Sequence, residues 1–206
     1  MLTTKAQFPV AIQVAWCALV LLFLYVTLSV LKDAPFWSTI GWRRLPADKT
    51  SLRNRAWPYF FAGSGLAALV AVLGIGVHPK EKTPIEELFK DPHGTMLLMA
   101  MAVFIAPLVE ETLFRGYLYP FFARKMGVPV GIILTGLLFG LMHGTQLGWS
   151  WGIVTLLILV GVVFTYARAR TGTVFASYLL HLGYNSLLAL TAALATHGFR
   201  QLPPTH

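Results

Sequence analysis

The sequence predicts an all-α fold, a polytopic membrane helix bundle with about six transmembrane helices. Of the 206 residues, 56% are hydrophobic and only 12% are charged, and the mean hydropathy is +0.68. In soluble domains about a quarter of the residues are charged. The apolar residues also gather in long runs, and about 20 such residues are enough to cross a ~30 Å hydrocarbon core. Together these observations exclude a soluble enzyme and place the chain in a lipid bilayer.

Six apolar segments, each bounded by charged or turn-forming residues, are the predicted helices. Their approximate ranges are 10–31, 58–77, 95–125, 128–143, 151–166 and 173–194. In the third segment Pro107 lacks an N–H and should kink the helix just before two glutamates. No repeat or linker divides the chain, so we predict one structural domain. Two N-terminal helices with a basic loop (1–94) precede a four-helix core (95–196) and a tail (197–206).

The distribution of basic residues predicts the orientation in the membrane. Segment 32–57 carries six Lys and Arg residues against two Asp, so this loop should be cytoplasmic and its three Trp side chains should lie at the membrane interface. The same rule favours both termini on the outer side, with a polar loop at 78–94 whose residues 85–89 form a short surface helix. The basic residues form no patch interleaved with aromatic ones, so the formal charge of +8 does not indicate nucleic acid.

Two adjacent glutamates, Glu110 and Glu111, stand inside the third apolar segment. An ionised side chain at the middle of a membrane helix costs roughly 2.5 to 3.5 kcal/mol, so each carboxylate needs a partner, a proton or a water-filled cavity. Arg115 lies one helical turn after Glu111 and should form an ion pair with it. Glu110, about 100° away around the helix, is then left without a partner in its own segment.

The spacing of polar residues predicts that three helices meet around Glu110. If the third and fourth helices form a hairpin that turns at 126–127, Glu110 lies sixteen residues before the turn and His143 sixteen after it. At 1.5 Å per residue both lie roughly 24 Å from the turn, at one level. His181 follows the turn before the sixth helix more closely, so it reaches that level only if the hairpin of the third and fourth helices projects into the cytoplasm. Asn185 lies four residues after His181 and shares its helical face. We therefore expect Glu110 to face both histidines.

A carboxylate beside imidazoles can hold and deprotonate a water molecule. A second imidazole and an amide N–H can stabilise the oxyanion that forms when this water attacks a carbonyl group. This set of groups predicts hydrolysis in a polar cavity between the third, fourth and sixth helices, near the cytoplasmic face.

The spacing of these residues also resembles a known family. The three motifs are Glu110-Glu111-x-x-x-Arg115, Phe139-x-x-x-His143 and His181-x-x-x-Asn185. In order and spacing they resemble the signatures of the CAAX-protease and bacteriocin-processing family of intramembrane endopeptidases, a match that covers about half of the chain. The resemblance implies that Glu110 and His143 activate the water, that His181 and Asn185 assist the oxyanion or place the water, and that Glu111, Arg115 and Phe139 support the site.

The resemblance further implies a peptide or protein substrate, lipidated in the eukaryotic members, and the short chain suggests a multi-pass protein of the bacterial cytoplasmic membrane. Members are often described as metalloproteases. Glu110, His143 and His181 are possible zinc ligands that would leave one open position. Asn185 would be an unusual fourth ligand, so we favour a site without a metal and keep zinc as the alternative cofactor.

Other functions are consistent with parts of the pattern. Each histidine alone could be a buried residue bonded to a carbonyl group, and Glu111 with Arg115 could be a structural ion pair only. The chain contains no His-Glu-x-x-His motif, which argues against a zinc site-two type protease. A proton-coupled transporter or channel could relay protons through the same groups, although no inverted repeat is visible. A non-catalytic membrane scaffold or immunity protein of the same fold is the third alternative.

Overall fold

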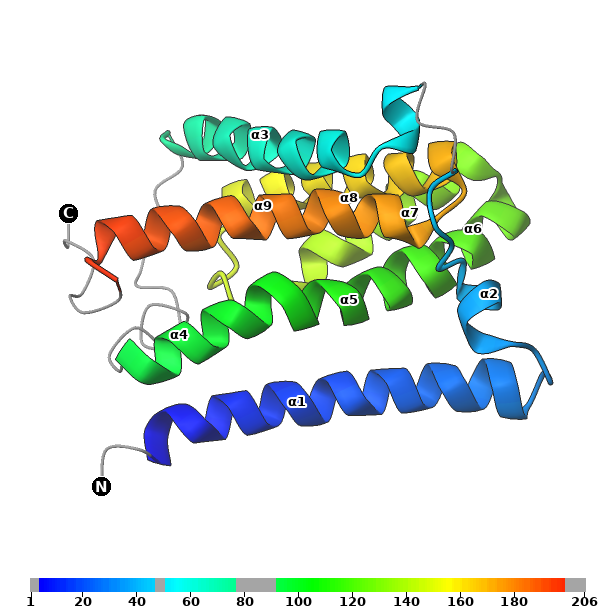
Figure 1. Ribbon diagram of the computed structural model, residues 1–206, viewed down its shortest axis with the longest axis horizontal. Coiled ribbons are helices and arrows are strands. Elements are labelled where there is room, and N and C mark those ends of the chain that lie inside the picture. The colour runs from blue at the N-terminus through cyan, green and yellow to red at the C-terminus, as the bar shows by residue number, and fades with distance from the viewer. Residues whose placement is uncertain (1–3, 47–50, 77–91, 199–206) are drawn as a thin grey trace.

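The computed structural model describes residues 4–46, 51–76 and 92–198, and within these ranges it contains helices and no strand (Figure 1). Five helices are long and apolar enough to cross a membrane, and a sixth apolar helix, Val128–Met142, is shorter. The predicted all-α bundle with about six membrane helices is therefore confirmed. The surface helix predicted at 85–89 and most of the predicted tail lie outside the described residues.

The helices follow the predicted apolar segments closely. The long ones are α1 Thr4–Tyr25, which continues as the π-helix η1 Val26–Val30, then α3 Trp57–Gly74, α7 Val128–Met142, α8 Trp151–Thr171 and α9 Val174–Ala195. Two short helices, α2 Phe36–Ile40 and η2 Leu52–Asn54, lie in the basic loop. Helix α1 begins earlier than predicted, and α8 continues to Thr171, which places Arg168 and Arg170 in its last turn. Cations are favourable there because the last helical carbonyls are partly negative.

The third membrane helix alternates between α and π geometry without a break. Its segments are α4 Pro92–Ala100, η4 Met101–Ile105, α5 Ala106–Glu111, η5 Thr112–Leu118 and α6 Tyr119–Met126. Pro107 and Pro120 each lie in the first turn of the α-helical segment that follows a π-helical one. Because a proline offers no N–H, each π turn comes directly before a residue that cannot continue the helical hydrogen-bond pattern. The break predicted at Pro107 thus takes the form of a change of helix type.

The bundle has two distinct ends. Figure 1 shows the N-terminal end of α1, the C-terminal end of α9 and the start of α4 at one end, and α2 and α6 at the other. The basic loop lies at this second end, together with the turn at Gly127 between α6 and α7, where φ is +88°. The predicted hairpin of the third and fourth helices is therefore present and turns at the predicted residue.

Glycines bring two pairs of helices into close contact. Gly136 and Gly140 of α7 lie against Val162 and Ile158 of α8, at distances where a Cβ would approach the backbone nitrogen of either residue to 2.7 Å. Gly63 of α3 and Gly183 of α9 similarly lie against backbone carbonyl groups of the opposite helix. Small residues permit such close backbone approach between membrane helices.

We predict that Gly63→Ala destabilises the protein, whereas Gly65→Ala does not. A Cβ at Gly63 would collide with the carbonyl oxygen of Leu180, but a Cβ at Gly65 would meet nothing within 4 Å. Overpacking costs about 1 to 3 kcal/mol, while alanine alone gains about 1 kcal/mol of helix propensity over glycine. Thermal unfolding of the two variants in one detergent should therefore shift in opposite directions. Equal shifts would show that α3 does not pack closely on α9.

The three tryptophans of the basic loop differ in their surroundings. Trp37 and Trp57 are exposed, as expected for interface anchors. Trp42 is not one, because its indole N–H donates to Oγ1 of Thr112 in the third membrane helix at 2.9 Å. Its neighbour Arg43 accepts a hydrogen bond from the hydroxyl of Thr173, the N-cap of α9. The segment after α2 is thereby fixed to the core, which corrects the interface assignment of Trp42.

Candidate active site

A buried ion pair forms the centre of the polar cluster. Glu111 and Arg115 have no exposed surface, and Nη1 of Arg115 donates to Oε1 of Glu111 at 2.8 Å, as predicted. The other two nitrogens of the Arg115 guanidinium donate hydrogen bonds to α8. Nη2 donates to the carbonyl oxygen of Gly161 at 2.9 Å, and Nε donates to Oγ1 of Thr165 at 3.2 Å. The guanidinium is thus held on both sides by fixed acceptors, which a buried charge requires.

Three phenylalanines surround the guanidinium of Arg115. Its Cζ lies 4.4 Å from the ring centre of Phe139, 5.3 Å from that of Phe164 and 5.8 Å from that of Phe114. Cations within about 6 Å of an aromatic ring are attracted by its negative face. The ring of Phe139 also lies 4.9 Å from the ring of His143 and 5.6 Å from that of His181. Phe139 therefore contacts both the guanidinium of Arg115 and the two imidazole rings.

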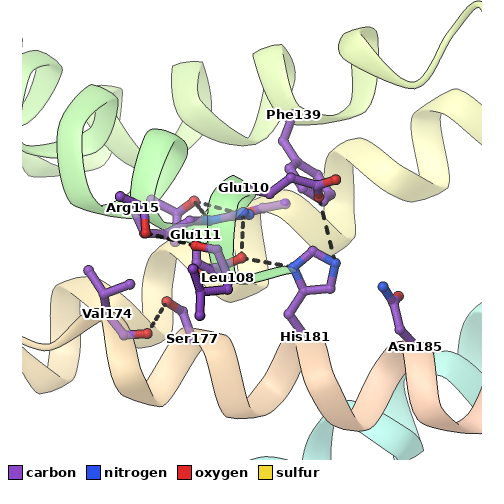
Figure 2. A network of polar contacts seen from close by, with 12 residues as sticks. Leu108, Glu110, Glu111, Arg115, Phe139, Val174, Ser177, His181 and Asn185 are labelled. Atoms are coloured by element: carbon purple, nitrogen blue, oxygen red, sulfur yellow. Dashed lines mark hydrogen bonds and ion pairs between the residues drawn. The ribbon is translucent and has the colours of Figure 1, made fainter. Parts of the chain in front are cut away.

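His181 bridges the two glutamates. Its Nδ1 lies 3.0 Å from Oε1 of Glu111, and its Nε2 lies 3.8 Å from Oε2 of Glu110 (Figure 2). Glu111 is paired with Arg115 and can only accept, so Nδ1 carries the hydrogen and Nε2 faces Glu110. The predicted ion pair between Glu111 and Arg115 is present, and the contact with His181 is an addition that was not predicted. The Glu111 carboxylate lies between α9 and the third helix and also fixes the ring of His181.

His143 is held in a similar way by the backbone. Its Nδ1 lies 2.8 Å from the carbonyl oxygen of Phe139, one turn earlier. A carbonyl oxygen can only accept, so Nδ1 is the donor and Nε2 is left free of this contact. Both histidines thus use Nδ1 for orientation, and both keep Nε2 for another partner.

These residues meet at one cavity of about 750 Å³. Its lining includes Glu110, Phe139, His143, His181 and Asn185, so the structure brings these predicted residues together. Glu111 and Arg115 do not line it. The side chain of Glu110 is 18% exposed and that of Glu111 is fully buried. Of the two adjacent carboxylates, Glu110 is the one that can meet water or substrate.

The cavity extends toward the end of the bundle opposite the basic loop. Besides the polar groups it is lined by α4, by the turn between α7 and α8, and by Leu188, Ala189 and Ala192 of α9. At this end α4 packs on α1, whereas η4 and α5 pack on α9 (Figure 1). The location of the chemistry near the cytoplasmic face stays a prediction.

Asn185 lies on the cavity wall but does not point its amide freely into the cavity. Its Nδ2 donates to the carbonyl oxygen of Ala102 in η4 at 2.8 Å. The amide has two hydrogens, so one remains for another acceptor. The contact with Ala102 was not predicted, because Pro107 in an α-helix would free the carbonyl of Val103, and only the π register of η4 moves this effect to Ala102.

The possible zinc ligands do not form a metal cluster. Across the part of the chain that the structure describes, no group of three or more His, Cys, Asp or Glu side chains is arranged to hold a metal ion. Nδ1 of each histidine is engaged, which leaves both Nε2 atoms free, as in histidines that bind zinc. A site without a metal, with zinc as the alternative cofactor, stays a prediction.

Helix α8 contributes residues to the site that were not predicted from the sequence. Thr165 and the carbonyl group of Gly161 bind Arg115, and Phe164 packs on its guanidinium and 4.9 Å from the ring of His181. All three lie in an apolar run that looked like an ordinary membrane span. A threonine four residues after a glycine in such a run was the available signal, because both provide oxygen acceptors on one helical face.

Comparison with known proteins relates the same part of the chain to proteases. The family model described as "Type II CAAX prenyl endopeptidase Rce1-like" matches residues 92–187. The chain is 35% identical over 96 residues to the UPF0177 protein YbdI of Lactococcus lactis subsp. lactis (strain IL1403), covering 47% of this chain and 49% of that protein. It is 31% identical over 143 residues to an "Uncharacterized 24.3 kDa protein" of Escherichia coli, covering 66% of this chain and 64% of the relative. The chain thus spans between half and two thirds of these relatives. No solved structure matches it.

Proposed function

We propose that this chain, whose residues 92–187 belong to the Rce1-like family of type II CAAX prenyl endopeptidases, hydrolyses peptide bonds within the membrane. The observation that supports this proposal best is the position of Glu110. Its partly exposed carboxylate faces the cavity beside Nε2 of His181, and His143 lines the same cavity. Water, a base and oriented imidazoles can therefore meet there, as hydrolysis requires.

In the proposed reaction Glu110 is the base. It removes a proton from a water molecule that also donates a hydrogen bond to Nε2 of His143, and the oxygen attacks the peptide carbonyl carbon. When His181 carries a second proton, its Nε2–H donates to the developing oxyanion, assisted by the remaining amide hydrogen of Asn185. The carbon–nitrogen bond then breaks as Glu110 returns its proton to the leaving amine. Glu111 keeps His181 in position by accepting from Nδ1.

The shape and composition of the cavity indicate an apolar substrate. Leucine, methionine and alanine side chains of α4, α8 and α9 form most of its wall away from Glu110. We propose a peptide or protein substrate that presents an apolar stretch beside the scissile bond, with a lipid-modified residue as one form of that stretch.

We predict that His143→Ala lowers the rate of proteolysis in vesicles. The purified protein would be reconstituted with detergent-extracted bacterial membrane proteins, and new peptide termini would be counted by mass spectrometry. Without His143, the attacking water loses the imidazole that accepts its second hydrogen bond, so the cleavage rate should fall at least about tenfold. His197→Asn is the control, because His197 lies in the turn after α9 and does not line the cavity. Equal cleavage by His143→Ala and wild type would rule out the proposed role of His143.

A further inference from the structure

The hydrogen-bond pattern of η4 leaves one carbonyl group without a helical donor. The N–H of Ala106 donates to the carbonyl oxygen of Met101, five residues earlier. The next bond in this register would join residue 107 to the carbonyl of Ala102. Pro107 has no N–H and cannot donate. The N–H that would serve Ala102 in an α-helix belongs to Ala106, which is already used on Met101.

Helix α9 supplies the missing donor. Nδ2 of Asn185 lies 2.8 Å from the carbonyl oxygen of Ala102. Two turns earlier on α9, the hydroxyl of Tyr178 lies 3.5 Å from the carbonyl oxygen of Phe104, a longer contact to the same π-helical segment. In hydrocarbon, an unsatisfied backbone group costs several kcal/mol, and side chains of neighbouring helices replace the bonds that a proline removes.

We propose that Asn185 is a positioning residue that binds the carbonyl group released by Pro107 and thereby fixes the π-helical wall of the cavity. This inference deepens the function proposed above and rests on it for its consequence on catalysis. Ala102, Ala106 and Glu110 line the cavity on one continuous helix. The bond from Asn185 joins that helix to α9, which carries His181, so it fixes the position of Glu110 relative to the imidazole.

The test is a double-mutant comparison of Asn185→Ala and Pro107→Ala by thermal unfolding of the full chain in detergent. Asn185→Ala alone should lower Tm by about 5 °C. Alanine at position 107 provides an N–H, so in either helical register the carbonyl of Ala102 regains a backbone donor. Asn185→Ala should then lower Tm much less when Pro107→Ala is also present. The control is Pro120→Ala, which alters the proline after η5 and should not reduce the cost.

Each outcome of the thermal comparison decides the proposal. Equal loss of Tm in both backgrounds, or no loss in either, would overturn it. If Asn185→Ala cannot be purified, recovery of Asn185→Ala/Pro107→Ala supports the proposal and failure of both overturns it. None of these measurements requires activity, so a chain without proteolysis would refute the proposed function and leave this test intact.

Kinetics separate positioning from direct catalysis. If Asn185 acts through the wall of the cavity, Asn185→Ala should lower kcat roughly 10- to 100-fold, and Pro107→Ala should restore part of that loss. An amide that acts only on the oxyanion would give a kcat loss that Pro107→Ala leaves unchanged, and this result would overturn the positioning role.

Discussion

Glu110→Gln is expected to abolish peptide-bond hydrolysis and to leave the fold intact. Among the cavity-lining residues that the structure describes, Glu110 is the one acidic side chain. Glutamine keeps its size and can accept a hydrogen bond from water, but it cannot take a proton. General base catalysis contributes typically 10²- to 10⁴-fold, so the cleavage rate in vesicles should fall by about that factor. Tm should change little, because the side chain is partly exposed and its contact with Nε2 of His181 is long, at 3.8 Å.

The same variant distinguishes the competing functions. A proton-coupled transporter would lose pH-driven flux in proteoliposomes when Glu110 is replaced, and neither the variant nor wild type would cleave peptides. A scaffold would show neither activity. If Glu110→Gln cleaves at the wild-type rate while Tm is unchanged, Glu110 is not the base and the proposed mechanism is wrong.

Counting residues was enough to predict much of the arrangement. Helix rise and the turn at Gly127 placed Glu110 and His143 at one level, and both line the cavity. The same logic predicted the ion pair between Glu111 and Arg115, which face each other one turn apart. These predictions succeed because 1.5 Å per residue and 3.6 residues per turn hold well over short stretches.

Counting failed where the helix departs from α geometry or where backbone groups act as partners. The π-helical segments η4 and η5 flank the two glutamates and change the rotation of residues along the third helix. Glu110 and Glu111 both lie in the α-helical segment α5, but the expected 100° between them did not separate their partners, because the two ring nitrogens of His181 reach both. The bond from Asn185 to Ala102 depends on the π register of η4, which decides which carbonyl group Pro107 leaves free and which the sequence does not reveal.

Replacing Arg115 should have the largest effect on stability of any change considered. Arg115→Met leaves the Glu111 carboxylate fully buried without its cation, and removing one partner of a buried pair costs about 3 to 5 kcal/mol. It also leaves Thr165 and the Gly161 carbonyl without their donor from Arg115. The Tm measured in detergent should fall by on the order of 10 °C. Arg115→Lys should recover part of this loss, because it restores charge but not the three-nitrogen geometry.

The double variant Glu111→Gln/Arg115→Met tests whether the loss comes from an unpaired charge. If it does, removing the carboxylate charge should restore Tm above that of Arg115→Met, with a coupling greater than about 0.5 kcal/mol. Catalysis should not recover in parallel. In the proposed reaction the ring of His181 donates from both nitrogens, and the carboxylate of Glu111 supports that ring by its charge, whereas a neutral amide gives only a hydrogen bond to Nδ1. Recovery of both stability and rate would show that the Glu111–Arg115 pair is structural alone. An unchanged or lower Tm in the double variant would instead mean that packing of the guanidinium between phenylalanines dominates its contribution.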